Sequence, residues 1–194
     1  MTEIIIPQSV TIIGAKAFDS SSLQIVHIPK SVTLIESDAF NKAIYVSMVH
    51  IDDFASWCNI EFDSVTANPC NQDNLSDYRK FYIDGEPVFD IVIPEQITAI
   101  KDYAFYNCQT MSSIYIPKDV KSIGEKALYN CAGHLIIDAN QPDYDYARSP
   151  FHNSQFKKVT LGDNIETVGA NFMTDCLKLK EVVLGKNLKS LDPL

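Results

Sequence analysis

The chain has 194 residues, of which 46% are hydrophobic and 21% charged, a composition typical of a globular protein that buries a continuous core. Its formal net charge is −9, and so acidic a surface repels phosphate backbones, which argues against a nucleic-acid partner. No apolar segment approaches the roughly 20 residues of a transmembrane helix, so we expect no membrane insertion by this chain.

From the N-terminus onward, one sequence motif, called the phrase below, recurs along the chain. Residues 6–18 and residues 28–40 match at every apolar position, and both begin with Ile-Pro and end with Ala-Phe. The phrase returns at 93–105 and, ending in Ala-Leu, at 116–128. The full unit is L-x-x-V-x-I-P-x-x-V-x-x-I-G-x-x-A-F-x-x-C-x-x, about 23 residues, a period that indicates a solenoid of the leucine-rich-repeat kind.

The unit fits the chain eight times, so we expect a single solenoid domain over residues 1–194. The predicted units start near residues 1, 23, 46, 88, 111, 134, 156 and 179. The interval between the third and fourth starts is much longer than the others, and we assign residues 69–87 to an insertion. Within it, Phe81–Val88 with the turn Asp84-Gly85 predicts a β-hairpin.

Each part of the unit predicts a local structure. The L-x-x-V-x-I stretch predicts a short strand whose fourth and sixth residues point inward. The V-x-x-I-G-x-x-A-F stretch has the three- and four-residue spacing of a helical turn. Gly14, Gly124 and Gly169 are expected to adopt backbone angles that a side chain would resist. Stacked units give an α/β repeat fold: short parallel strands on one wall, helical turns or loops on the other, and one inserted β-hairpin.

The third unit departs from the repeat after Ile51. Asp52 and Asp53 precede a short predicted helix that contains Trp57, and both acids suit an N-cap and first helical turn better than catalysis.

The outward positions of each strand, the third and the fifth, supply the candidate binding surface, because the strand wall is where solenoids commonly bind. Apolar members gather toward the N-terminus, and exposed apolar clusters often mark contacts. In the sixth unit the outward pair is predicted to be Ile136 and Asp138. The candidate ligand-binding residues are Ile5, Ile25, His27, Met48, His50, Asp90, Val92 and Tyr115.

His27 and His50 share the fifth position in neighbouring units. Adjacent parallel strands lie about 4.8 Å apart, so the two imidazoles can stack. One interpretation is a metal or pH-sensitive site, and the other is a ladder of surface residues. No third ligand accompanies them, which favours the ladder and predicts no metal site.

No signature of an enzyme or a cofactor site is present. The sequence lacks a nucleophile elbow, a zinc-protease helix, a phosphate-binding glycine loop and paired C-x-x-C motifs, so we expect neither catalysis nor a cofactor. Of five cysteines, Cys108, Cys131 and Cys176 recur at one repeat position, which indicates small buried thiols. Whether Cys58 and Cys70 form a disulfide stays open at this stage.

The sequence resembles the BspA-like leucine-rich repeats of bacterial and protist surface proteins. The resemblance rests on the repeated I-P-x-x-V-x-x-I-G-x-x-A-F phrase, on Trp57–Phe62 followed by Ala67-Asn68-Pro69, on the Asp-Gly hairpin and on Ser149-Pro150-Phe151. It implies a secreted or cell-surface adhesion module that binds a host or matrix protein, and it carries over no binding residue. The alternative is a structural spacer that displays another part of a larger surface protein.

The two ends of the chain bear on location and assembly. Met1-Thr2-Glu3-Ile4 lacks the basic and apolar regions of a signal peptide, so we expect a cytoplasmic protein or a trimmed part of a secreted one. Neither end carries a polar capping element, and uncapped solenoid ends indicate a trimmed chain, missing flanking segments or a homo-oligomer such as an intertwined dimer.

Overall fold

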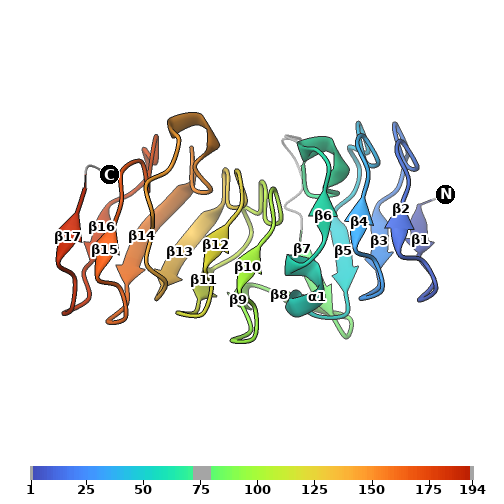
Figure 1. Ribbon diagram of the computed structural model, residues 1–194. Coiled ribbons are helices and arrows are strands. Elements are labelled where there is room, and N and C mark those ends of the chain that lie inside the picture. Colours follow the sequence, from blue (N-terminus) through green and yellow to red (C-terminus); the bar gives the residue numbers. More distant parts are fainter. Residues whose placement is uncertain (1, 72–79, 193–194) are drawn as a thin grey trace.

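The computed structural model of the protein describes residues 2–71 and 80–192. These residues form an elongated stack of turns, with the two ends of the chain at opposite ends of the stack (Figure 1). The predicted leucine-rich-repeat solenoid is confirmed. Residues 72–79, part of the predicted insertion, lie outside the described residues.

One wall consists of longer strands arranged in two five-stranded sheets rather than in one. The first sheet contains β1 (Glu3–Ile5), β3 (Ile25–Ile28), β5 (Met48–Ile51), β7 (Lys80–Ile83) and β8 (Glu86–Val88) in that order. The second contains β9 (Asp90–Val92), β11 (Ser113–Ile116), β13 (Ala132–Ile137), β14 (Gln155–Leu161) and β16 (Glu181–Val183). All neighbouring strands are parallel except β7 and β8, which form the predicted hairpin.

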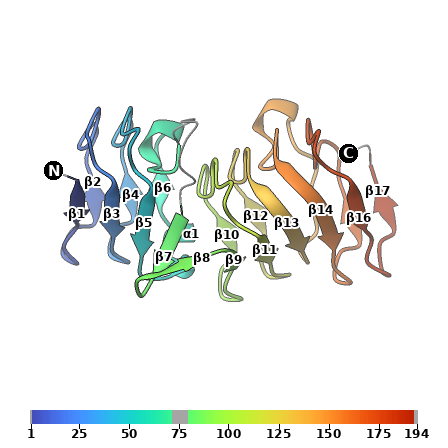
Figure 2. The same cartoon turned by 180° about the vertical axis from the view of Figure 1, so that it is seen from behind.

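The hairpin also interrupts the wall. Its first strand, β7, pairs in parallel with β5 and so takes the place of a repeat strand, whereas β8 turns back and ends the first sheet. Figure 2 shows the hairpin between β5 and β9, where the two sheets separate. The parallel strands predicted for this wall are therefore present, but they form two sheets rather than one.

The second wall is built of two-residue strands and turns. The strands are β2 (Ile12–Ile13), β4 (Leu34–Ile35), β6 (Glu61–Phe62), β10 (Ala99–Ile100), β12 (Ser122–Ile123), β15 (Thr167–Val168) and β17 (Ser190–Leu191). Helical turns were expected at most of these positions. The backbone instead bonds to the neighbouring repeat, as where Glu36 N–H donates to the Ile13 carbonyl (2.9 Å). One residue in each short strand except β17, such as Ile35 or Ile100, is buried in the core.

Helix is confined to three short elements in the described residues: α1 (Phe54–Cys58) and the 3₁₀ turns η1 (Val65–Ala67) and η2 (Tyr146–Arg148). An N-cap was predicted in the pair Asp52-Asp53, and Asp53 supplies it: its carboxylate accepts from Ser56 N–H at 2.7 Å. No helix in this part of the chain is long and apolar enough to cross a bilayer.

The repeat glycines do not adopt the special backbone angles that the sequence predicted for them. Among the described glycines, positive φ occurs at Gly85 and Gly133, not at Gly14, Gly124 or Gly169. A Cβ on Gly124 would lie 2.4 Å from the backbone nitrogen of Asp102, one repeat away. Close approach between repeats therefore selects glycine there.

The core runs through the whole stack. Phe40, Phe105 and Phe151 occupy the aromatic position of the repeat and are fully buried. The cysteine position of the repeat comes three residues after the aromatic position, and two of its thiols contact the preceding repeat. Cys131 Sγ lies 2.9 Å from the Phe105 carbonyl oxygen, and Cys176 Sγ lies 3.3 Å from the Phe151 carbonyl oxygen. All five cysteines are free thiols, including Cys58 and Cys70.

The segment after β5 links the two halves of the molecule. Trp57, fully buried in α1, donates from Nε1 to the carbonyl of Ala104 (2.8 Å). Asn68, also fully buried, donates to the carbonyls of Tyr103 (2.7 Å) and Ala104 (3.2 Å). Cys58 in turn accepts at its carbonyl from Lys101 N–H (3.3 Å). The second wall is therefore held together where its strands leave a gap between β6 and β10.

Candidate functional site

The structure divides the eight candidate residues between the two sheets. Ile5, Ile25, His27, Met48 and His50 lie on the first sheet, and Asp90, Val92 and Tyr115 lie on the second. Ile5 and Val92 are 68% and 59% exposed, Asp90 is exposed and the other five are half-buried. All eight alternate with buried inward residues, but they form two groups rather than one continuous surface.

The first group forms two rows across the parallel strands. One row contains Glu3, Ile25 and Met48, and the other contains Ile5, His27, His50 and Tyr82. The imidazoles of His27 and His50 stack with their centroids 4.1 Å apart, which confirms the expected stacking. Tyr82 continues the stack at 4.8 Å from His50.

Tyr82 was missed because residues 69–87 were assigned to an insertion. The sequence contains a signal for it, since the long interval between the third and fourth starts is nearly two repeats. Phe81 and Ile83 also have the two-residue spacing of inward strand positions, and Phe81 is buried. We name the row Ile5, His27, His50 and Tyr82 the aromatic row.

The electrostatics of the aromatic row favour neutral imidazole at His50. Burial lowers the pKa of His50, the neighbouring His27 lowers it further, and Glu3 opposes both. Glu3 Oε1 lies 2.9 Å from His27 Nε2. Among the described residues, no three His, Cys, Asp or Glu side chains are grouped so that they could hold a metal ion.

A pocket of about 520 Å³ opens beside the aromatic row, where β1, β3 and β5 end. The hairpin turn closes one side of it. Asp84 and Gly85 both have positive φ (52° and 83°), the backbone of a type I′ turn that the Asp-Gly pair predicted. The lining residues are Ile5, Ile6, Gln8, His27, Ile28, Pro29, His50, Ile51, Asp52, Asp84 and Gly85.

Asp52 lines this pocket and is neither the N-cap nor a first-turn residue of α1, the two positions predicted for the Asp52-Asp53 pair. Its carboxylate accepts from Lys30 N–H (2.9 Å) and from Gln8 Nε2 (3.0 Å). The hydrogen bond from Gln8, then the one from Lys30, lower the pKa of Asp52, so it is ionised at neutral pH. Asp84 is exposed, and no ion pair or hydrogen bond to its carboxylate is present in the described part of the chain.

The second group of candidates is internally paired. Asp90 accepts from Ser113 Oγ (2.6 Å), and Tyr115 donates to Asp138 (3.3 Å). The pairing of β11 with β13 sets Ser113 opposite His134 and Tyr115 opposite Ile136. The outward pair is therefore His134 and Ile136, and the expected pair Ile136 and Asp138 was shifted by two residues.

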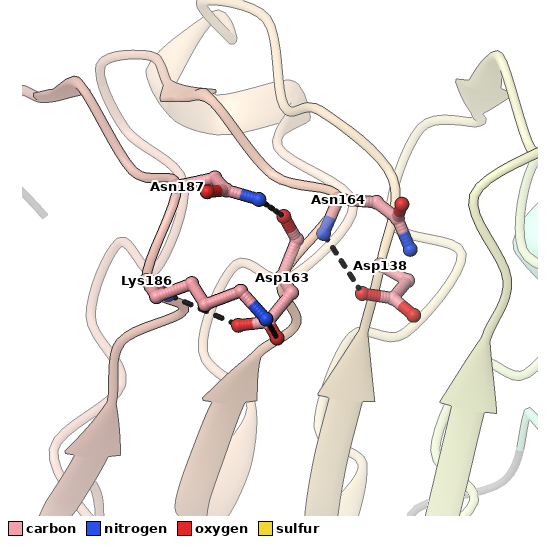
Figure 3. Close-up of polar contacts among 5 residues, drawn as sticks. All are labelled: Asp138, Asp163, Asn164, Lys186 and Asn187. Carbon is pink, nitrogen blue, oxygen red and sulfur yellow. Dashed lines mark hydrogen bonds and ion pairs between the residues drawn. The ribbon is translucent and has the colours of Figure 1, made fainter.

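Acids at the strand ends of the C-terminal half are also used between repeats. Asp163 pairs with Lys186 Nζ (2.6 Å), and its backbone carbonyl accepts from Asn187 Nδ2 (2.8 Å) (Figure 3). Asp138, which occupies the same repeat position as Asp52, accepts from Asn164 N–H (3.5 Å) (Figure 3). The pocket beside the aromatic row, by contrast, contains an acid, Asp84, without a partner in the described residues.

The comparison with protein families agrees with the repeat. The model of the BspA type leucine rich repeat region matches residues 1–67 and 79–193 in six copies. No curated protein matches the sequence. A leucine-rich repeat protein from Eubacterium ventriosum is 23% identical, with a TM-score of 0.48, over 94% of this chain and 55% of that one.

A leucine rich cell surface protein from Faecalibacterium prausnitzii is 20% identical, with a TM-score of 0.43, over 95% of this chain and 60% of that one. The chain thus spans less than two thirds of the length of either solved structure. Repeats of the BspA type are protein-interaction modules of surface or secreted proteins and are typically non-catalytic. Because the family model matches nearly the whole sequence, the chain belongs to the BspA-type leucine-rich-repeat family.

Proposed function

We propose that the chain is a non-catalytic adhesin-like module that binds a host or matrix protein through the first sheet of its strand wall, as part of a secreted or cell-surface protein. The observation that carries the proposal is the pair of outward rows on β1, β3, β5 and β7. They combine apolar side chains at Ile25 and Met48 with the aromatic row, which includes Ile5.

The composition of these rows suits a protein contact. Half-buried apolar and aromatic side chains lose little conformational freedom when a partner covers them, and they supply most of the binding energy in protein interfaces. The second sheet offers less, because Asp90, Ser113, Tyr115 and Lys158 are paired with neighbouring side chains. Protein ligands are therefore expected on the first sheet.

The test is surface plasmon resonance against purified matrix proteins (fibronectin, laminin and collagen). The variant Ile25→Glu/Met48→Glu places two charges on neighbouring strands of the first sheet, since Ile25 and Met48 are paired in register. The matched control is Ile12→Glu/Leu34→Glu, which changes an equivalent register pair on the second wall.

We expect at least one matrix protein to bind the wild type saturably, to lose at least tenfold in affinity for the strand-wall variant and to bind the control normally. Circular dichroism of both variants checks that the fold is kept. Equal loss in both variants would refute the strand wall as the binding surface. An absence of saturable binding to every member of the panel would refute the adhesin function and favour the structural spacer.

A further inference from the structure

We propose that the pocket beside the aromatic row receives a basic side chain, arginine or lysine, of the protein partner, with the Asp84 carboxylate as its counter-ion. This inference rests on the proposed function, because it assigns the chemistry of the partner at one end of the same strand wall.

The size and walls of the pocket fit a long amphipathic side chain. Its volume of about 520 Å³ exceeds that of any one side chain, so an arginine or lysine can enter with part of its backbone. Ile5, Pro29 and Ile51 supply apolar surface for a methylene stem. Gln8, His27 and His50 add polar atoms to the lining, of which Gln8 Nε2 donates to Asp52 and His27 Nε2 lies 2.9 Å from Glu3 Oε1. Basic side chains bury their stems along such surfaces while the charged head meets polar groups.

The charge of the pocket selects a cation over an anion. Its ionisable lining residues are His27, His50, Asp52 and Asp84, and no lysine or arginine lines it. Lys30 lies close enough to contribute to the lowered pKa of Asp52, but it forms no ion pair there. The net charge of −9 adds a general attraction for basic partners.

Five acids elsewhere in the chain form the kind of ion pair that Asp84 lacks in the described residues. Glu61, Glu125, Asp163, Glu166 and Glu181 each lie within 3.1 Å of a lysine or arginine nitrogen of the chain itself. Asp84 sits at the hairpin tip over the pocket with no such partner in the described residues. A cation from another molecule would complete at Asp84 the pairing that the chain supplies elsewhere.

The stacked rings add a second recognition element. In the stack His27–His50–Tyr82 both faces of the His50 ring are covered, at 4.1 and 4.8 Å, so the polar edge of that ring remains for a ligand. A neutral imidazole offers an acceptor nitrogen at its edge, which suits an N–H donor such as a guanidinium or ammonium group.

The experiment is an NMR titration of the full chain with N-acetyl-arginine methylamide and, separately, with the lysine derivative. The neutral control is the citrulline derivative, which keeps the shape of arginine without its charge. The Gly85 amide and the His27 and His50 imidazoles report on the pocket. We expect saturable shifts at these groups with a dissociation constant on the order of millimolar for the cations, since one side chain supplies little binding energy.

Two variants on the hairpin complete the design. Asp84→Asn keeps the turn, because Asn-Gly is a favoured type I′ pair, and removes the proposed counter-ion. Glu86→Gln removes one negative charge from the same hairpin outside the pocket lining. Asp84→Asn should weaken arginine binding about fivefold, the upper range for an exposed ion pair, and Glu86→Gln should leave it nearly unchanged.

The inference is overturned if citrulline binds as tightly as arginine, if the two variants behave alike, or if no pocket resonance shifts saturably. The proposed function would not be affected by such a result, provided that Ile25→Glu/Met48→Glu abolishes the binding of a matrix protein. Conversely, arginine binding that depends on Asp84 would support the inference about the pocket even if no matrix protein in the panel binds.

Discussion

At the scale of single residues, the repeat is defined by side chains that fill the space between one turn of the solenoid and the next. Phe105 is fully buried and contacts the rings of Phe54 and Phe81, each with centroids 6.0 Å away. The inward direction of such residues could be predicted, because the repeat fixes which positions are apolar. The contacts with Phe81 could not, because Phe81 lies outside the recognised units.

We expect Phe105→Ala to lower the free energy of unfolding by roughly 3–5 kcal/mol, because it leaves a cavity in the stacked core. Tyr45, which is 57% exposed, provides the control, and Tyr45→Ala should change stability by about 0.5 kcal/mol or less. Urea denaturation measures both. A loss below about 1 kcal/mol at Phe105 would contradict the inward assignment.

Gly14 and Gly124 occupy the same repeat position in different surroundings. A Cβ on Gly124 would meet the Asp102 backbone nitrogen at 2.4 Å, whereas the nearest atom to a Cβ on Gly14 is Glu36 Oε2 at 3.8 Å. Gly124→Ala should therefore destabilise the protein by about 1–3 kcal/mol through overpacking. Gly14→Ala should be neutral or stabilise it by up to about 1 kcal/mol. Equal effects on the thermal midpoint would show that close approach does not select glycine.

His50 should titrate below the ordinary value of 6.5, because burial and then His27 lower its pKa. A lowered folded-state pKa means that the unfolded state binds more protons between the two values, so stability falls as the pH drops through that window. NMR titration of the imidazole gives the pKa directly. In His27→Ala the pKa of His50 should rise, since one lowering cause is removed, and an unchanged or lower value would contradict the stacking account.

At the scale of elements, α1 and η1 replace the second half of one repeat and attach it to the next. The sequence predicted a helix whose N-cap lies in the pair Asp52-Asp53, because capping is a local property. It could not predict that Trp57 and Asn68 donate to the carbonyls of Ala104 and Tyr103, which lie more than 30 residues away. It also could not reveal the short strands of the second wall, whose hydrogen bonds run between repeats.

Asn68→Ala tests this attachment. The change removes two hydrogen bonds to the Tyr103 and Ala104 carbonyls and one that Asn68 Oδ1 accepts from Cys70 N–H (2.7 Å), and it leaves buried polar groups unsatisfied. We expect a loss of about 2–4 kcal/mol in the free energy of unfolding. The control Asn59→Ala removes an exposed side-chain bond to Ala55 and should cost less than about 1 kcal/mol. A cost at Asn68 no larger than at Asn59 would refute the linking role.

At the scale of the whole molecule, the solenoid could be predicted because the repeat is visible in the chain. The division of its strand wall into two sheets could not, because that depends on how the hairpin pairs with β5. The same pairing adds Tyr82 to the row of His27 and His50 and brings Asp84 to the pocket. The candidate site is therefore a product of an irregularity placed on a regular scaffold. Homo-oligomerisation through the ends of the stack stays a prediction.

The central claim is that protein ligands cover the first sheet of the strand wall. Methyl cross-saturation NMR tests it most directly on the complex of the labelled chain with a matrix protein that binds in the panel. The methyl groups of Ile5, Ile25 and Met48 should lose intensity when the unlabelled partner is irradiated, while those of Ile12 and Ile44, exposed elsewhere, keep theirs. Saturation centred on Ile12, with none at Ile25 and Met48, would contradict the account.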